Sequence, residues 1–266
     1  MPNSSKLVPT YSYKVGRSTD HDWFHYIVLG DFHVGHENFL EKEARAMVKW
    51  ISQRDPATTC VLITGDMTEN VLPSSKGSAF ELAIPDPIKQ IDAVVDILKP
   101  IKHLIVAGCD GNHSYRSRIA SGHSPDKEVF EKLGIERKFL GYSGYHRIKI
   151  EDRQGKNGIL YTVWAEHGSK NANSVEGKVR ILRTMMASHQ MADLYAMGHI
   201  HTKLAITDRV IRINGNREEV SKVMFVSNGS YLFDAEYARR GGYIPGGPGV
   251  AKVQFSTRRK DIHCSI

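Results

Sequence analysis

The stretch HYIVLGDFH, residues 25–33, sets the pattern of the first half of the chain. A short apolar run ends in Gly30 and Asp31, which is typical of a buried strand that stops at a polar loop. Two further stretches repeat the pattern, TTCVLITGD at 58–66 and HLIVAGCDGNH at 103–113. Helical patterns separate the three, at 39–54 and at 85–100. This alternation predicts a β-α-β-α-β unit with parallel strands.

The second half of the chain, from about residue 145, is rich in strand patterns. A helix is expected at about 174–190 and a long Gly/Pro loop at 241–249, and the apolar runs predict strands at 145–152, 158–168, 192–201, 203–215, 218–231 and 250–257. Glycine-containing turns between some of these runs favour antiparallel hairpins. We therefore predict one domain over residues 1–266, an α/β fold in which two mixed β-sheets form a sandwich flanked by helices. Roughly the first 20 residues are expected to be irregular.

Composition indicates a soluble globular protein. The 266 residues are 41% hydrophobic and contain no apolar run of the length that a membrane span needs. Three widely spaced cysteines provide no disulfide framework, so we expect a cytoplasmic protein that does not contact membranes. The net charge is +7, and residues 238–260 contain six basic side chains and no acidic one. Such a segment permits a nucleic-acid partner, although a solvated surface is the more common explanation of a charge cluster of this size.

Metal-binding side chains follow each of five predicted strands. Their positions are Asp31 and His33, Asp66, Asn112 and His113, His167, and His199 and His201. A single histidine or aspartate in such a place is usually a turn residue or part of the core. Five strand ends in succession with this chemistry point to one shared site, because functional groups of α/β folds collect at the carboxyl ends of strands.

The side-chain types indicate which metal the site would bind. Carboxylate, amide and imidazole ligands without cysteine suit borderline divalent ions such as manganese, iron or zinc, with nickel or magnesium as alternatives. The ligands outnumber the four of a tetrahedral zinc site. They suffice for two ions, a pair that can bind a phosphoryl oxygen and lower the pKa of a water. We expect two divalent ions, manganese first among them.

The motifs GDxH, GD, GNH, a lone His and GHxH, in this order over residues 30–201, resemble those of the calcineurin-like metallophosphoesterases. The resemblance implies a β-sandwich of two mixed sheets with helices outside. It also implies roles for the residues. The first metal would be bound by Asp31, His33 and His201, the second by Asn112, His167 and His199, and Asp66 would bridge them. His113 would assist the leaving group without binding metal.

Three features are left open by this resemblance. Ser114 stands where the family usually has a carboxylate after GNH, so the group that orients His113 is unknown from the sequence. His36 either approaches the site or lies on the surface. Arg116 and Arg118 are candidates for binding the substrate phosphate, because guanidinium pairs with phosphate through two hydrogen bonds.

The function expected from these observations is hydrolysis of a phosphate ester by a metal-bound hydroxide. A phosphodiester is favoured as the substrate, with nucleic acid as a candidate. The alternatives are a phosphomonoesterase or phosphoprotein phosphatase, and a phosphoesterase fold that serves as a non-catalytic scaffold. An enzyme and a non-catalytic scaffold would differ in metal content and in hydrolysis of bis-p-nitrophenyl phosphate. A structural zinc domain is excluded by the absence of closely spaced cysteine ligands.

Overall fold

The computed structural model describes residues 7–15, 22–73, 75–152, 155, 158–189, 191–243 and 245–266. The strands are β1 (Thr10–Lys14), β2 (Trp23–Leu29), β3 (Thr59–Ile63), β4 (Ile105–Gly108), β5 (Ser143–Glu151), β6 (Gly158–Glu166), β7 (Leu194–Met197), β8 (Leu204–Asn214), β9 (Arg217–Ser227), β10 (Ala251–Ser256) and β11 (Ile262–Ser265). The α-helices are α1 (Glu41–Ser52), α2 (Pro87–Leu98), α3 (Asn112–Ser121), α4 (Pro125–Lys132), α5 (Val175–Ser188) and α6 (Glu236–Arg240). Short 3₁₀ helices lie at Ala79–Glu81, Lys99–Ile101 and Glu136–Lys138.

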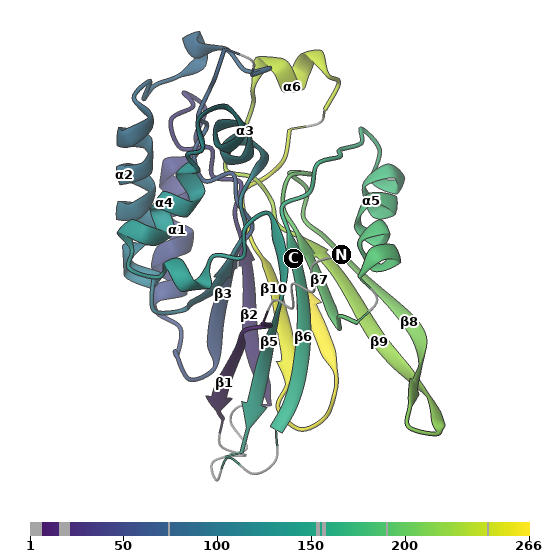
Figure 1. Cartoon of the computed structure of the whole chain (residues 1–266). Helices are drawn as coiled ribbons and strands as arrows, with labels where there is room; N and C mark the ends of the chain where they lie inside the picture. Colours follow the sequence, from purple (N-terminus) through teal and green to yellow (C-terminus); the bar gives the residue numbers. More distant parts are fainter. Residues whose placement is uncertain are drawn as a thin grey trace.

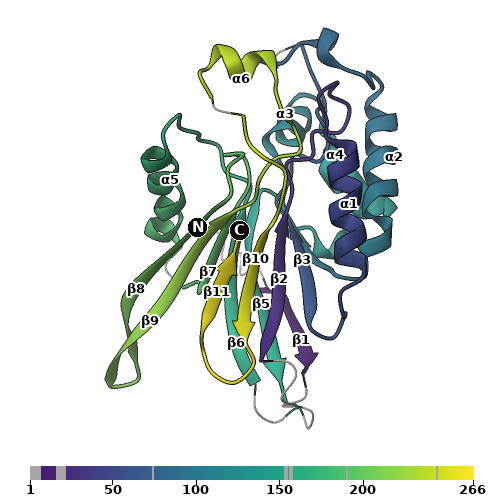
Figure 2. The same cartoon turned by 180° about the vertical axis from the view of Figure 1, so that it is seen from behind.

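The strands form two mixed sheets, as the sequence predicts. One sheet has the order β11-β10-β2-β3-β4, and in it β2, β3 and β4 are parallel. The other has the order β1-β5-β6-β7-β9-β8, in which β6 and β7 are parallel and β8 and β9 form an antiparallel hairpin. Figures 1 and 2 show the two sheets face to face with helices on their outer sides. The predicted fold class, a two-sheet α/β sandwich flanked by helices, is confirmed.

Alternation along β2 explains why its sequence is apolar almost throughout. Phe24, Tyr26 and Val28 point into the core between the two sheets, whereas Ile27 and Leu29 point to the opposite face. Successive side chains of a strand face opposite ways, so a strand covered on both sides needs apolar residues at every position.

The helices cover the outer faces of the sandwich. Apolar side chains of α1, α2 and α4 pack on the outer side of the β2-β3-β4 region, and α5 packs on the other sheet through Leu182 and Met185. Figure 1 shows α5 on the far side of the sandwich from α1, α2 and α4, with α3 and α6 above the strands. The upper end of the sandwich is therefore surrounded by α3, α5 and α6.

Some elements were not expected from the sequence. Helix α3 begins at Asn112, directly inside the GNH motif, and its sequence lacks an apolar stripe that would reveal it. The expectation of an irregular start to the chain is wrong for Thr10–Lys14, which form β1 and pair in parallel with β5, and residues 1–6 and 16–20 lie outside the described residues. Whether residues 1–266 form a single domain stays a prediction.

The described part of the chain contains no helix long and apolar enough to cross a membrane. All three cysteines are free, and Cys60 and Cys109 are buried. The cytoplasmic location stays a prediction.

A buried histidine in the core should make stability depend on pH. A hydrogen bond of 2.7 Å joins the Tyr26 hydroxyl of one sheet to Nε2 of His146 on the other. Burial lowers the pKa of His146 to about 3. The unfolded chain binds a proton at this residue near pH 6.5, so the free energy of unfolding falls as pH decreases from about 6.5 towards 3.

At pH 5 this effect should amount to about 2 kcal/mol, since each pH unit below the unfolded pKa contributes about 1.4 kcal/mol. Urea denaturation measures the free energy of unfolding at each pH. Between pH 7 and pH 5 this free energy should fall less in His146→Gln than in the unmodified protein, by about this amount. An equal loss in both proteins would mean that other groups cause the pH dependence.

Candidate metal centre

The side chains predicted to bind metal meet at the upper end of the sandwich. Each follows a strand that ends there: Asp31 and His33 follow β2, Asp66 follows β3, Asn112 follows β4, His167 follows β6, and His199 and His201 follow β7. Parallel strands end at the same edge of a sheet, and the two sheets bring their edges together. The predicted ligands, which are spread over residues 31 to 201 of the sequence, thus meet at one end of the sandwich.

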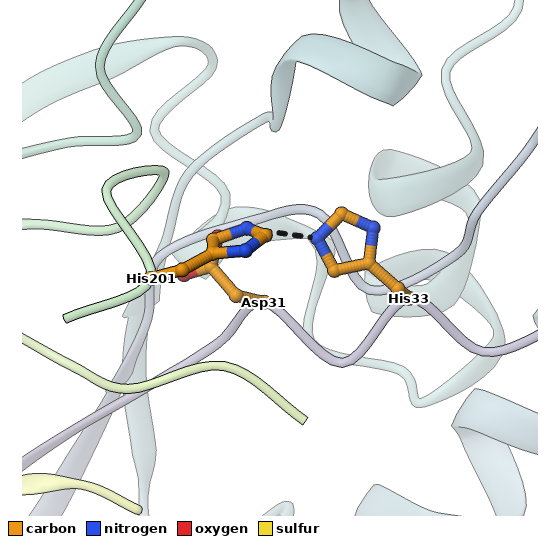
Figure 3. Close-up of side chains that lie close together, drawn as sticks. All are labelled: Asp31, His33 and His201. Carbon is orange, nitrogen blue, oxygen red and sulfur yellow. Dashed lines mark hydrogen bonds and ion pairs between the residues drawn. The ribbon is translucent and has the colours of Figure 1, made fainter. Parts of the chain in front are cut away.

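The first group joins Asp31, His33 and His201, whose ligand atoms lie within 4.8 Å of one another. Nε2 of His201 lies 3.1 Å from Nε2 of His33 and 3.3 Å from Oδ1 of Asp31. Figure 3 shows the three side chains converging, with the contact between the two histidines dashed. When two ligand atoms each lie about 2.0–2.2 Å from one ion and the angle between the two bonds is nearly 90°, the two atoms are about 3 Å apart. These separations therefore fit a shared cation.

The second group joins Asp66, His167 and His199. Nε2 of His167 lies 3.0 Å from Oδ2 of Asp66 and 2.9 Å from Oδ1 of Asn112. A third group joins His33, Asp66 and His113. Since Asp66 and His33 each belong to two groups, the three groups form one continuous cluster.

The backbone of these residues adopts an uncommon conformation. The described non-glycine residues with positive φ are six, and five of them are predicted ligands: Asp31 (52°), His33 (55°), Asp66 (47°), His199 (64°) and His201 (51°); the sixth is Asn70 (46°). A left-handed conformation is unfavourable for residues with a Cβ, and such residues cluster at functional sites. The ligands are therefore held in position against a local backbone cost.

Glycines before the ligands let the loops approach one another closely. A Cβ on Gly111 would lie 2.1 Å from the backbone nitrogen of Asp66, and one on Gly65 would lie 2.5 Å from that of Gly111. A Cβ on Gly198 would lie 2.7 Å from Oδ2 of Asp31. The Gly-Asp, Gly-Asn and Gly-His pairs of the sequence are thus required by contact between loops, and not only by turns.

The prediction that residues 192–201 form one strand is wrong in part. Strand β7 ends at Met197, and His199 and His201 lie beyond it in a loop, both with positive φ. This loop brings His199 to Asp66 and His201 to Asp31. Its conformation is fixed in part by the backbone N–H of His199, which donates to Oδ1 of Asp31 over 2.9 Å.

Hydrogen bonds orient the ligands from outside the cluster. A carboxylate oxygen of the buried Glu69 lies 2.8 Å from Nδ1 of His33, and the backbone oxygen of Thr64 lies 2.8 Å from Nδ1 of His167. When Nδ1 carries the proton in both rings, Nε2 is free to bind a metal. Asn228 donates to Oδ2 of Asp31 over 2.7 Å. The sequence analysis missed Glu69 and Asn228, and the only local signal for Glu69 was a carboxylate three residues after Asp66.

The structure also answers what orients His113. Nδ1 of His113 hydrogen-bonds the backbone oxygen of Glu69, and the Glu69 carboxylate lies 3.8 Å from the same nitrogen. Ser114 has a different role, because its hydroxyl accepts a hydrogen bond from the backbone N–H of Asp126 and so joins α3 to α4. The anionic neighbour that the sequence does not provide at residue 114 is provided by Glu69.

The charges of the cluster call for a cation. Burial raises the pKa of Asp66, but His167 and His113 outweigh burial and hold it well below its usual range. Burial lowers the pKa of His167, but the Asp66 carboxylate outweighs burial and raises it to about 9. Burial lowers the pKa of His199 to about 3. Ionised carboxylates and a neutral imidazole at hydrogen-bond distances are the donors that divalent ions prefer, so the residues fit metal ions.

A cavity of about 550 Å³ opens beside the cluster. Its lining includes His33, Asp66, Asn112, His113, His199, His201, Arg116 and Lys178. Arg118 is not among the described lining residues, and its guanidinium lies 3.5 Å from Oδ2 of Asp110 and over the ring of Tyr115. The substrate roles of both arginines stay predictions, and only Arg116 lies where a substrate in the cavity would meet it.

His36 is not a surface residue. It is buried, and its Nδ1 accepts a hydrogen bond from the backbone N–H of Asn38. Its Nε2 lies 3.7 Å from Oε1 of Glu81, and His36 is not among the described residues that line the cavity.

The basic segment 238–260 is largely neutralised by acidic residues from other parts of the chain. Five of its six cations form ion pairs: Arg239 with Asp234, Arg240 with Glu236, Arg258 with Asp22, Arg259 with Asp261, and Lys260 with Asp193. Ion pairs therefore offset much of the positive charge of this segment, while the net charge of the chain stays +7.

Known proteins resemble the chain over parts of its length or in fold. No family model matches the chain. The DNA polymerase II small subunit of Thermoplasma acidophilum is 28% identical over 109 residues, which cover 38% of this chain. The match spans only 22% of the length of that subunit.

Two solved structures resemble the chain over most of its length. A Streptococcus pneumoniae protein described as a predicted phosphoesterase covers 92% of this chain and 99% of its own, with 12% identity and a TM-score of 0.32. GAP50 of Plasmodium, described as the anchor in the inner membrane complex, covers 91% of this chain and 88% of its own, with 8% identity and a TM-score of 0.44.

The described residues form a two-sheet sandwich with helices outside, and the residues that the resemblance assigns to metals meet at its strand ends. The resemblance stated from the sequence agrees with this arrangement. The site contains buried histidine and aspartate groups that could hold metal ions.

The position of Asp66 in two of the three groups leads to a prediction about metal content. We expect Asp66→Asn to lose both ions, because it removes the anion between them and leaves two dications to repel each other. Glu69→Gln is the matched control, because it alters an orienting carboxylate and should weaken affinity by about 10- to 100-fold without removing a ligand. Elemental analysis after dialysis against a range of metal concentrations separates the two effects. Retention of two ions by Asp66→Asn would show that Asp66 does not bridge.

Proposed function

We propose that this protein is a hydrolase of phosphodiesters that depends on two divalent metal ions. One observation carries the proposal: seven metal-binding side chains from five strand ends meet beside a cavity, and five of them adopt a left-handed backbone. Burying these polar side chains on a left-handed backbone does not stabilise the fold, so a functional role is the simpler explanation of their arrangement.

The residues would divide into two ligand sets. Asp31, His33 and His201 would hold one ion, Asn112, His167 and His199 the other, and Asp66 would contact both. When bound, two such ions lower the pKa of a water and offset the charge of the phosphate. Manganese is the first ion to test, since histidine, carboxylate and amide donors without thiolate suit it.

His113 would hold a proton at the leaving oxygen. Its Nδ1 is engaged by the backbone oxygen of Glu69, so Nε2 is the nitrogen available to the cavity. The hydrogen bond fixes the ring plane, and the Glu69 carboxylate lies 3.8 Å from the same Nδ1. General acid assistance of this kind contributes about 10² to 10⁴-fold to the rate.

The extent of the cavity supports a diester over a monoester. Its lining includes Arg116 on α3 and Lys178 on α5. Figure 1 shows these two helices on different sides of the upper end of the sandwich. A diester has two organic arms, and space on both sides of the ligands accommodates both. Nucleic acid remains a candidate substrate, although the ion pairs of segment 238–260 remove one of the reasons for it. A non-catalytic scaffold has little support, because every ligand position is filled.

The proposal is tested by a substrate panel with manganese, iron, zinc, nickel or magnesium added to metal-free protein. We expect hydrolysis of bis-p-nitrophenyl phosphate to exceed that of p-nitrophenyl phosphate, and chelation to abolish both. The panel extends to single- and double-stranded DNA, RNA, cyclic nucleotides and phosphopeptides. Preference for the monoester would assign the protein to the phosphatases, and no hydrolysis with two bound ions would support the scaffold.

The role of His113 leads to a prediction about leaving groups. His113→Gln should keep both ions and should lose kcat by about 10² to 10⁴-fold on alkyl esters, which need a proton at the leaving oxygen. The loss on nitrophenyl esters should be much smaller, because nitrophenolate leaves without protonation. Equal losses on both kinds of ester would reject the acid role, and loss of an ion would identify His113 as a ligand.

A further inference from the structure

Lys178 is a buried cation in the wall of the cavity. It is only 5% exposed, and it lines the same cavity as His199 and His201. Its ammonium group donates to the hydroxyl of Thr202 over 2.6 Å. Among the described residues no carboxylate lies within ion-pair distance of it. A buried ammonium group without an anion is costly, so a charge of opposite sign is expected to come from outside the chain.

The position of Lys178 in its helix adds to this cost. Helix α5 begins at Val175, with Ser174 as its cap, so Lys178 lies in the first turn. The positive end of the helix dipole disfavours a cation there and favours an anion. Burial lowers the pKa of Lys178, which agrees with an environment that lacks an anion. Stability of the fold would be served better by an uncharged side chain at this position.

Of the other cations that line the cavity, Arg240 has an acidic partner, whereas Arg116 and Lys76 form no ion pair with the described residues but are less buried than Lys178. Arg240 lies 3.6 Å from Oε1 of Glu236, and Arg239 beside it lies 3.2 Å from Oδ1 of Asp234. Arg116 lines the cavity from α3, beside Asn112 and His113, where the phosphate to be cleaved would lie. Lys178 lines it from α5 and is held next to His201 through Thr202.

We propose that the Lys178 ammonium, held by Thr202, binds a second phosphate group of the substrate, separate from the phosphate that is cleaved. This inference rests on the proposed phosphodiesterase function and narrows its substrate class. The substrate would be a phosphodiester that carries a further phosphate, as a nucleic-acid strand or an end-phosphorylated nucleotide ester does. A simple diester with uncharged arms would leave Lys178 without its anion.

A pair of substrates that differ in one phosphate tests this inference. Thymidine 3′-(4-nitrophenyl phosphate) is compared with its 5′-phosphorylated counterpart, and a third substrate has an internucleotide diester in place of the terminal phosphate. We expect kcat/KM to be at least about tenfold higher with the second phosphate, the effect of one charge-assisted hydrogen bond. Whichever of the two phosphorylated forms gives the larger effect identifies the source of the phosphate.

The variant Lys178→Met should reduce this preference to about one. Arg180→Met is the matched control, because it removes an exposed cation from the same helix, and it should keep the preference. An unchanged preference in Lys178→Met would overturn the proposal. Equal losses on all three substrates would mean that Lys178 binds the phosphate that is cleaved, which also overturns it.

Two measurements do not depend on turnover. The Tm of Lys178→Met should equal or exceed that of the unmodified protein, because a buried cation at a helix N-terminus is replaced by an apolar side chain. A lower Tm would indicate a structural role and contradict the proposal. Calorimetric titration should show that thymidine 3′,5′-bisphosphate binds more tightly than thymidine 3′-phosphate to the unmodified protein, and equally to Lys178→Met. If no ester is hydrolysed with any metal, the proposed function fails, and this titration still decides the role of Lys178.

Discussion

The burial of two carboxylates, Asp31 and Asp66, is the constraint on which the rest of the structure depends. Both are almost inaccessible to water, and a buried charge is tolerated only when hydrogen bonds and opposite charges surround it. Asp31 receives hydrogen bonds from the backbone of His199 and from Asn228, and Asp66 receives one from the backbone of His113. The loops that follow β2, β3, β4 and β7 are thus held together by the anions at their centre.

This constraint explains why the loops have their unusual backbone. The N–H groups can reach the carboxylates only if the loops approach to the distance at which Gly65, Gly111 and Gly198 leave no room for a Cβ. The ligand residues then take left-handed conformations, each at a cost of order 1–3 kcal/mol. The sandwich beneath supplies the compensating stability through three hydrophobic clusters, one between the sheets and one under each helical layer.

Cations around the site differ in burial and in their partners. On the surface, Arg258 pairs with Asp22, and an exposed pair of this kind contributes little free energy. Inside the cavity, Lys178 has only the Thr202 hydroxyl. A buried ammonium group with no anion among the described residues marks a place where an anionic ligand would bind. The location of unpaired charge is therefore more informative about the substrate than the net charge of +7.

The sequence by itself determined the parallel β-α-β-α-β unit and the mixed sandwich, and it singled out the side chains that are candidates for binding metal. It could do so because these features are local: an apolar run predicts a strand buried on both faces, and a polar residue after glycine marks where the strand ends. Only the tertiary structure decided which groups support the site. Glu69 meets His33 from 36 positions away and Asn228 meets Asp31 from 197, and no periodicity records such contacts. The same holds for two cations of the basic segment 238–260, since Arg258 and Lys260 pair with Asp22 and Asp193, which lie close to them only after folding. Pairing between distant residues is a property of the packed chain, because it depends on how the two sheets bring their strand ends together.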